Sequence, residues 1–340
     1  MRSAGWRVAR SEAERVRRDL RERGSLRVDL EVQRTEEFVT FPLLGPPIEP
    51  LPSDGVLVEA EFAPSGRTPT RNYRDLLDWG PEAVRRLPRS YDVVGDVVLV
   101  RIPVELLDRS EEIGRALLAF VPGARVVGRD EGVRGTARRR QLVPIAGAGG
   151  FRTRHRENGL DLQVDLERAY FSPRLGREHS RVAELVRPEE RVLDLCCGVG
   201  PFALTIARDG RAREVVAVDS NPEAIELLES NLGRLHPRRP VRAIVADVAE
   251  FVATSGVADR VVLNLPHEGI KYLTSVGKSV APAGVLHYYE VTERSASDRR
   301  PEELLRELDP GGWALAERHV VHPYSPRSDL VEYALSRAGP

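Results

Sequence analysis

The sequence predicts an α/β protein whose C-terminal half forms a mostly parallel, doubly wound sheet behind smaller α+β domains. Strand-like and helix-like stretches alternate from about residue 170 onward, which is typical of a parallel sheet with helices on both faces. An apolar run at 192–195 leads into a glycine-punctuated turn and then into a helical pattern. Three later apolar runs also end in polar side chains, which predicts a ligand-binding edge of the sheet.

The chain of 340 residues is long enough for two or three domains, and 41% hydrophobic residues can supply a core for each. No apolar run approaches the roughly 18 residues of a membrane span, and the first residues lack the apolar core of a signal peptide. We therefore expect a cytoplasmic protein without a membrane partner. Cys196 and Cys197 are adjacent, so a disulfide between them is unfavourable, and no metal cluster is indicated.

The net charge of −1 conceals an uneven distribution of basic residues. Lysine occurs only at 271 and 278, so nearly all of the 51 basic residues are arginine, which biased codon usage would also explain. Position is more informative, because residues 125–156 hold nine arginines against two acidic residues. A basic segment within a nearly neutral chain favours a surface for polyanions.

Residues 1–50 are predicted to form a small α+β domain. Ala13, Val16 and Leu20 form one apolar stripe and predict a helix, while alternation at 26–32 and 37–41 predicts strands. A proline-rich stretch at 45–55 then predicts a domain boundary.

A second α+β domain is predicted at 56–168, and it contains the arginine-dense segment. Its predicted elements are a strand at 56–62, a helix at 73–87, a strand kinked by glycine at 91–102, a helix at 111–120, and short strands through 133, at 141–145 and at 160–166.

The third domain, predicted at 169–340, begins with a helix at 180–186, and its four motif strands follow. A later strand is predicted at 285–291, and an antiparallel pair at 313–322 and 330–335 is expected to close the sheet.

The polar residues that end the four motif strands are Asp194, Asp219, Asp247 and Asn264. Asp219 lies about 20 residues beyond the glycine turn, where an acid can bind the two hydroxyls of a ribose. Both NAD enzymes and class I S-adenosylmethionine (SAM) methyltransferases fit this outline. The G-x-G-x-x-G fingerprint of NAD enzymes is absent, because 201 is proline and 203 is alanine. The constellation resembles the Rossmann-like SAM methyltransferases more closely.

A more specific resemblance covers nearly the whole chain. The motifs that carry it include Tyr170-Phe-Ser-Pro-Arg-Leu, Asn264-Leu-Pro and the segments at 91–98, 157–159, 178–182, 198–202 and 287–289. They resemble the archaeal and eukaryotic tRNA (guanine(37)-N1)-methyltransferases. A sister group, the wybutosine-pathway aminocarboxypropyltransferases, shares the second and third domains but reads differently at Ser172-Pro-Arg and Asn264-Leu-Pro. Two departures from the family pattern stand out, namely Cys196-Cys197 and the segment 136–140, where a Phe-Arg-Thr-Arg is more usual.

The resemblance implies which residues act on the base. Guanine N1 carries a proton, so methylation needs a base to remove it and a donor to hold the negative charge that gathers on O6. By the family motif Glu178 is the base and Arg138 the O6 donor, with a register uncertain among 138–140. Taken alone, Glu178 is an ordinary first-turn helix charge, and Arg138 is one of three consecutive phosphate-facing arginines. The implied substrate-binding residues are Tyr170, Arg174, Asn264 and Pro266; Arg174 could instead pair with an RNA phosphate.

The resemblance also implies the cofactor and the partner. SAM is expected to contact His179, Asp194, Gly198, Gly200, Asp219, Ser220, Asp247, Val248 and Asn264. The partner is tRNA, from which the target base must be flipped, and the enzyme is expected to be a monomer without a metal. Three alternatives stay open: a wybutosine-pathway enzyme acting on the same nucleotide, a tRNA-binding protein without turnover, and a methyltransferase for a small molecule or a protein.

Overall fold

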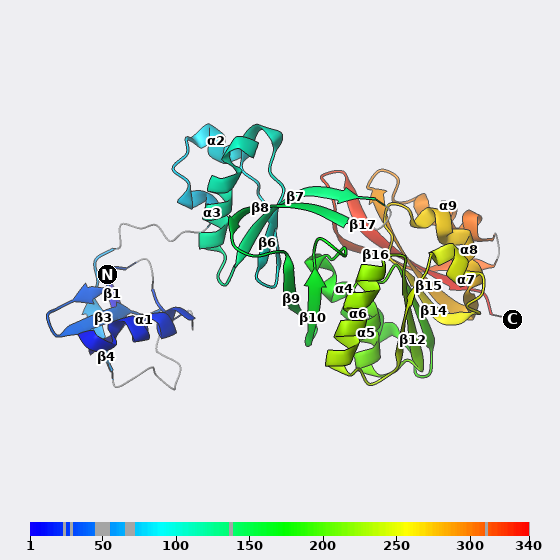
Figure 1. Ribbon diagram of the computed structural model, residues 1–340, viewed down its shortest axis with the longest axis horizontal. Helices are drawn as coiled ribbons and strands as arrows, with labels where there is room; N and C mark the ends of the chain where they lie inside the picture. Colours follow the sequence, from blue (N-terminus) through cyan, green and yellow to red (C-terminus); the bar gives the residue numbers. More distant parts are fainter. Residues whose placement is uncertain are drawn as a thin grey trace. The chain divides into compact units, whose positions relative to one another are not determined.

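The computed structural model describes residues 1–22, 25–27, 30–44, 55–64, 72–135, 139–309 and 312–339. These form two compact units, Met1–Trp79 and Gly80–Pro340 (Figure 1). In the described parts of the chain, no helix combines the length and the apolar character that crossing a membrane requires.

The first unit is a small antiparallel sheet with one helix. Its strands are β1 (Arg2–Ala9), β2 (Gln33–Arg34), β3 (Phe38–Pro42) and β4 (Val56–Glu61), in the order β2-β3-β1-β4. The predicted helix is α1 (Ala13–Glu22), and its stripe of Val16 and Leu20 packs against Trp6 and Phe41 of the sheet. The sequence did not predict β1, and the strand expected at 26–32 is reduced in its described residues to single bridges at Leu26 and Leu30.

The predicted boundary before residue 56 is wrong. We expected 56–62 to open the second domain, but β4 pairs antiparallel with β1 along its whole length, from Arg7–Val56 to Arg2–Glu61. The pairing satisfies backbone groups that β1 would otherwise present as an open edge. The first unit therefore reaches past the proline-rich stretch, whose residues 45–54 lie outside the described residues.

The second unit begins with a four-stranded sheet in the order β5-β6-β7-β8. Its strands are β5 (Asp92–Val94), β6 (Val97–Val100), β7 (Val126–Arg134) and β8 (Arg139–Gly147), and the predicted helix at 111–120 is confirmed as α3 (Ser110–Phe120). The single strand predicted at 91–102 is instead a hairpin. Gly95 makes its turn at φ +57°, where a Cβ would lie 2.2 Å from Thr153 Oγ1. The helix predicted at 73–87 is likewise two short pieces, a 3-10 turn at Tyr73–Leu76 and α2 (Pro81–Arg86), which begins after Gly80.

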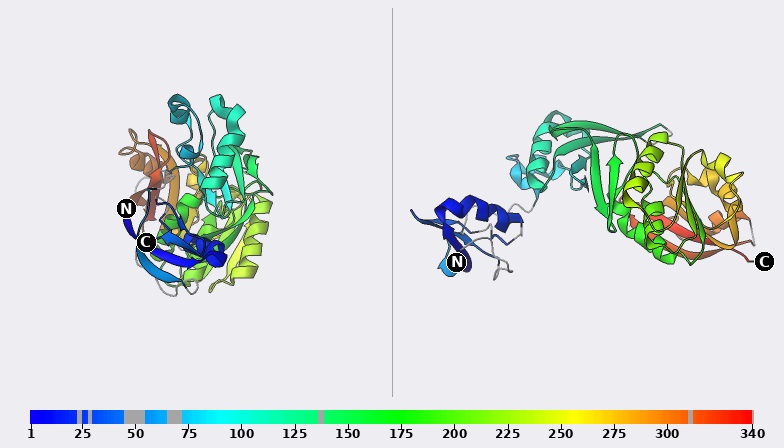
Figure 2. Two further views of the ribbon diagram at one scale, coloured as in Figure 1. Left: turned by 90° about the vertical axis from the view of Figure 1, so that its left-hand side faces the viewer. Right: turned by 60° about the horizontal axis from the view of Figure 1, so that its bottom comes forward.

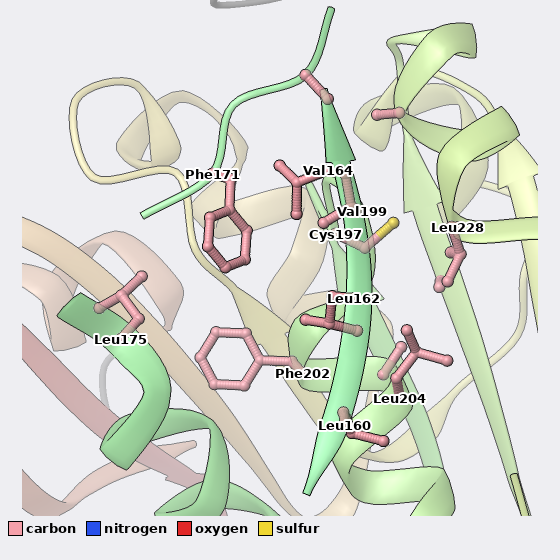
Figure 3. Packing of buried hydrophobic residues seen from close by; sticks show 14 of the residues in the cluster. Leu160, Leu162, Val164, Phe171, Leu175, Cys197, Val199, Phe202, Leu204 and Leu228 are labelled. Carbon is pink, nitrogen blue, oxygen red and sulfur yellow. The ribbon is translucent and has the colours of Figure 1, made fainter. Parts of the chain in front are cut away.

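A two-stranded hairpin, β9 (Arg152–Glu157) and β10 (Leu160–Asp165), joins this part of the unit to the large sheet. Leu160, Leu162 and Val164 on its inner face lie in the same core cluster as Phe202 and Leu228 (Figure 3). Asn231 on α6 (Pro222–Leu235) fixes the register by accepting from the backbone of Gln163 at 2.7 Å and donating to it at 3.1 Å. The division predicted at 168/169 therefore crosses a continuous core and stays a prediction.

The large sheet has seven strands in the order β13-β12-β11-β14-β15-β17-β16. They are β11 (Arg191–Leu195), β12 (Glu214–Asp219), β13 (Val241–Val245), β14 (Ala258–Leu263), β15 (Val280–Glu293), β16 (Trp313–Pro323) and β17 (Ser328–Arg337). The first five in this spatial order are parallel, and β17 runs antiparallel to both of its neighbours. The predicted doubly wound sheet and its closing antiparallel pair are confirmed.

Helices cover both faces of this sheet (Figure 1, Figure 2). One face carries α4 (Gly176–Leu185), α5 (Pro201–Asp209) and α6, and the other carries α7 (Val248–Val252), α8 (Leu273–Lys278) and α9 (Arg300–Leu308). Alternate residues of the strands serve the two cores, so that Val192 packs with the first set of helices and Leu193 with the second. The sheet is therefore buried on both faces, and its carboxyl edge is the place where loops can bind ligands.

Candidate active site

The four polar residues predicted at strand ends meet at one edge of the sheet. Asp194 is the penultimate residue of β11 and Asp219 ends β12, while Asp247 and Asn264 follow β13 and β14. These strands are neighbours and parallel, so their carboxyl ends share an edge. The chain order reverses between β11 and β14, which is where open α/β sheets bind ligands.

The glycine turn between β11 and α5 brings the backbone close to this edge. Gly198 and Gly200 have φ of +56° and +81°, values that residues with a Cβ rarely adopt. A Cβ on Gly200 would also lie 2.4 Å from Leu228 Cδ1. Pro201 then begins α5, where its missing N–H costs nothing. The sequence therefore builds a turn that leaves room for a ligand in front of a helix N-terminus.

Asp194 lies at the bottom of this turn and is fully buried. Its Oδ2 accepts a hydrogen bond from Ala203 N at 3.0 Å, whereas its Oδ1 has no partner among the described residues. Burial raises the pKa of Asp194 to about 7, and the nearby charge of Asp219 adds to this. A buried carboxylate with one unused oxygen fits a ligand that brings a donor or a positive charge.

The next two acids, Asp219 and Asp247, are partly buried, and each makes local bonds to backbone N–H groups. Asp219 accepts from Gly198 N at 2.8 Å and from Asn221 N at 2.9 Å. Burial raises the pKa of Asp219, although these two backbone bonds oppose the rise. Asp247 caps α7 by accepting from Ala249 N at 2.8 Å. Ser220 is exposed beside Asp219, and Val248 is buried behind Asp247.

Glu178, the predicted base, lies in the first turn of α4 and is 3% exposed. Arg181 holds both of its oxygens, with Nε 2.9 Å from Oε2 and Nη2 2.8 Å from Oε1, and the Tyr289 hydroxyl donates to Oε1 at 2.6 Å. Burial alone would raise the pKa of Glu178, but the bonds from Arg181 and Tyr289 outweigh it and lower the pKa. The carboxylate is therefore ionised at neutral pH and fixed in orientation.

Behind Arg181 lies a buried chain of charged groups that the sequence did not predict. Glu332 Oε2 lies 3.0 Å from Arg181 Nη2 without hydrogen-bond geometry, and its Oε1 lies 2.8 Å from His287 Nδ1. Arg260 Nη1 lies 2.6 Å from His287 Nε2, so this ring nitrogen accepts and Nδ1 carries the proton. Burial lowers the pKa of His287 to about 3 and raises that of Glu332 to about 7.

A cavity of about 780 Å³ opens beside Glu178. Its lining includes Arg174, Arg181 and His319 from three different elements. His319 on β16 places Nε2 3.6 Å from Glu178 Oε2 and keeps 38% of its side chain exposed. Arg174 donates to Asp92 Oδ1 at 2.8 Å, which ties the start of α4 to the hairpin of β5 and β6. Glu178 therefore faces a space large enough for a nucleobase.

The arginines at 138–140 differ in what the structure describes of them. Arg138, the predicted O6 donor, lies outside the described residues, which omit 136–138. Arg139 pairs with Glu223, and Arg140 is buried with its guanidinium 5.0 Å from the centroid of the Tyr170 ring. Arg140 also pairs with Asp130 and donates to Phe171 O at 3.2 Å. Arg140 therefore supports the half-exposed Tyr170 from below.

Three further predicted residues lie close to these groups. Asn264 has a buried Oδ1 without a partner in the described chain, and Pro266 O accepts from Val291 N at 3.2 Å. His179 is buried, with Nδ1 2.8 Å from Glu157 Oε1 and its ring 4.5 Å from the Phe202 ring. Its Nε2 is buried and has no hydrogen-bond partner among the described groups.

The arrangement therefore combines a glycine turn with strand-end acids for a nucleoside-like ligand and a fixed carboxylate facing a cavity. Comparison with known proteins agrees with this arrangement of the site. The family model described as "TRM5/TYW2 methyltransferase domain" matches residues 153–310, and the one described as "TYW2 N-terminal domain" matches 73–150. The tRNA (guanine(37)-N(1))-methyltransferase Trm5b of Pyrococcus abyssi is 34% identical over 325 residues, which cover 94% of each chain. The chain belongs to the TRM5/TYW2 methyltransferase family.

Solved structures of this family extend the match to the whole fold. The crystal structure of Trm5b from Pyrococcus abyssi covers 99% of both chains with a TM-score of 0.73 at 31% identity. A complex of aTrm5 with tRNALeu covers 98% of this chain and 99% of that one, with a TM-score of 0.70 at 28% identity. A sister enzyme, the tRNA(Phe) (4-demethylwyosine(37)-C(7)) aminocarboxypropyltransferase of Pyrococcus horikoshii, is 28% identical over 67% of this chain and 80% of its own length. The resemblance that the motifs predicted is confirmed.

Proposed function

We propose that this protein is a tRNA (guanine(37)-N1)-methyltransferase that transfers a methyl group from SAM to N1 of guanine 37. The observation that carries the proposal is the match to Pyrococcus abyssi Trm5b, which is named for this activity. The alignment covers 94% of both chains at 34% identity. The position of Glu178 supports it independently, because an ionised carboxylate facing a cavity of about 780 Å³ can act on a base placed there.

The residues at the sheet edge fit SAM. Asp194 has a buried oxygen without a partner among the described atoms, and Gly198 and Gly200 have the positive φ that the tight turn beside it requires. We assign Asp219 to the ribose hydroxyls and Asp247 to the adenine amino group. When bound, SAM supplies a methyl group already activated by a sulfonium. The protein's own task is to align the base and to handle its proton.

Glu178 removes the N1 proton in this proposal, so that the ring nitrogen gains a lone pair in the plane of the base. Arg181 and Tyr289 hold the carboxylate in one orientation, which favours proton removal from one direction. The negative charge that moves to O6 needs a donor, and Arg138 is our candidate. One proton is released for each methyl group transferred.

The flipped guanine would be held by groups already near the cavity. Tyr170 offers a half-exposed ring for stacking, and Asn264 offers a buried amide oxygen without a partner in the described structure. Arg174 is held by Asp92, so its remaining guanidinium nitrogens can reach either the base or a phosphate. Pro266 fixes the backbone beside Asn264.

A second surface suits the tRNA backbone. An arginine concavity of about 750 Å³ is lined by Arg125, Arg152, Arg154, Arg156 and Arg234 together with Asp96 and Asp161. The arginines outnumber the acids here by five to two, which leaves a local positive charge. These residues include the end of the arginine-dense segment that the sequence singled out, and phosphates are the ligands such a surface attracts.

The test is mass analysis of nucleotide 37 after incubation of the protein with SAM and unmodified tRNA carrying guanine at that position. We expect a gain of one methyl group, located at N1 by comparison with a 1-methylguanosine standard. No gain, or methylation at another nucleotide, would reject the proposal.

The sister activity is the second candidate, since residues 73–150 match a domain model named for TYW2. It would transfer the aminocarboxypropyl group of SAM to a wyosine precursor. The same mass analysis separates the two, because that group is heavier than a methyl group and requires the tricyclic base as acceptor.

A further inference from the structure

The proton that leaves guanine N1 must pass from Glu178 to solvent, and the surroundings of Glu178 restrict how it can do so. Glu178 is 3% exposed, and its two oxygens are occupied by Arg181 and Tyr289. The same bonds lower the pKa of Glu178, so the carboxyl group holds a proton poorly. A second group must take the proton before the next turnover. This inference rests on the proposed function.

The described groups that face Glu178 come from four elements, and most of them cannot accept a proton and release it. Arg181 on α4 stays protonated at all relevant pH values. Burial raises the pKa of Tyr289 on β15 well above its usual range, so its hydroxyl keeps its own proton. Glu332 on β17 is 0% exposed and has no route to water of its own. Glu317 on β16 pairs with Arg181 from its far side.

His319 on β16 differs from all of these. Its Nε2 lies 3.6 Å from Glu178 Oε2, which is the oxygen that Tyr289 does not bind. Its side chain is 38% exposed and lines the same cavity as Glu178. An imidazole can accept a proton on one nitrogen and release it from the other near neutral pH. His319 therefore connects the buried carboxylate with solvent.

We propose that His319 is the proton relay of this enzyme. Glu178 takes the proton from guanine N1 while N1 forms its bond to the methyl carbon and the sulfonium carbon–sulfur bond breaks. The proton then moves from Glu178 Oε2 to Nε2 of His319, and the opposite ring nitrogen gives its proton to water. Glu178 returns to its ionised form, and the products are the methylated base, the thioether and one proton.

The arrangement around Arg181 permits this cycle. Glu332 Oε2 lies 3.0 Å from Arg181 Nη2 and has no hydrogen-bond partner in the described chain, while Glu317 Oε2 lies 3.3 Å from Nη1. When Glu178 is briefly protonated, Arg181 therefore keeps its ion pair with Glu317, and Glu332 lies beside it. The positive charge of Arg181 is never left unpaired, which keeps the transient state accessible.

The test is the single-turnover methyl-transfer rate of His319→Gln on tRNA with guanine 37. We expect a fall of roughly tenfold or more at low buffer concentration, because a relay contributes as general acid–base catalysis does. Added imidazole should restore the rate of the variant in proportion to its concentration and leave the wild-type rate unchanged. SAM affinity should stay the same, since His319 lies at the Glu178 cavity and not at the strand ends assigned to SAM.

His322→Gln is the matched control, because His322 is another partly buried histidine of β16 whose ring bonds only to Pro323 O at 2.9 Å among the described contacts. It should keep the wild-type rate. A wild-type rate in His319→Gln, or a fall that imidazole does not relieve, would overturn the relay. A wild-type enzyme that leaves guanine 37 unmethylated would instead reject the proposed function.

Discussion

The two halves of the site are built in different ways. The cofactor edge is formed by short, local stretches of chain. They are a glycine turn, a helix N-terminus and acidic residues that lie at or just after the ends of strands. The surroundings of Glu178 are made of side chains from α4, β15, β16 and β17, which lie up to 154 residues apart along the chain, as Glu178 and Glu332 do. Local patterns therefore specify the first region, whereas the second exists only once the sheet has closed.

The largest expected effect concerns the cavity. Glu178→Gln should lower the single-turnover methyl-transfer rate by roughly 100-fold or more, because the amide cannot take the N1 proton. SAM affinity should stay within about twofold of wild type, since the two regions are separate in their bonds. Isothermal titration with SAM alone and a quenched rate measurement check both values. Glu184→Gln, on the exposed end of α4, is the control. Loss of SAM binding in Glu178→Gln would show that Glu178 belongs to the SAM site and that the two regions are not separate.

In contrast to Glu178→Gln, a change at the glycine turn should weaken SAM binding. Gly200→Ala puts a Cβ 2.4 Å from Leu228 Cδ1 at φ +81°, so the turn must shift. We expect SAM affinity to fall at least tenfold, with a loss of stability of about 1–2 kcal/mol from the left-handed backbone. Gly233→Ala is the control, because Gly233 lies in α6 with open space around it and should gain helix stability. Equal SAM affinity in Gly200→Ala and wild type would contradict the role given to the turn.

The pH dependence of SAM binding should report on Asp194. A carboxyl group with a pKa raised to about 7 is half protonated at that pH, and a cationic ligand prefers its ionised form. SAM affinity should therefore increase by about tenfold between pH 6 and pH 8, and this slope should vanish in Asp194→Asn. Without SAM, the free energy of unfolding should change with pH in the opposite direction. A carboxyl group whose pKa is raised in the folded state contributes its full stabilisation below its ordinary pKa, and this contribution is lost as pH rises through about 7. Thermal unfolding of both proteins at several pH values checks this, and a flat wild-type binding profile would contradict it.

The smallest effect is expected in the arginine concavity, whose lining residues belong to neither region. The double variant Arg154→Gln and Arg156→Gln should weaken tRNA binding a few-fold and reduce the slope of its salt dependence by about one for each phosphate that is no longer neutralised. Methyl transfer at saturating tRNA should be unchanged. Arg306→Gln on α9 is the control, since its exposed side chain pairs only with Glu302 among the described groups. An unchanged salt slope in the double variant would place the tRNA backbone on another surface.

The sequence predicted where the glycine turn and the strand-end acids lie, because each of them depends on residues close in the chain. The glycine turn and the acids Asp194, Asp219 and Asp247 are visible as strand endings, and strand–helix alternation predicted the sheet. The partners of Glu178 were not predicted. Arg181 could have been suspected, since it lies three residues on along one helix face, but Tyr289, His319 and Glu332 approach through strand pairing that no local pattern specifies. The boundary predicted before residue 56 failed for the same reason, as β4 pairs with a strand about 50 residues earlier.

The hairpin of β9 and β10 also limits how the family's parts can be exchanged. Leu160 and Leu162 of the hairpin belong to the core of the large sheet, and Asn231 on α6 bonds to the backbone of Gln163 in β10. A chimaera joined at residue 168 would give this hairpin a foreign helix to lie on and leave α6 with an uncovered apolar side. A junction placed before β9, near residue 150, would keep hairpin and sheet from one parent, and we expect substrate choice to transfer between relatives only through junctions of that kind.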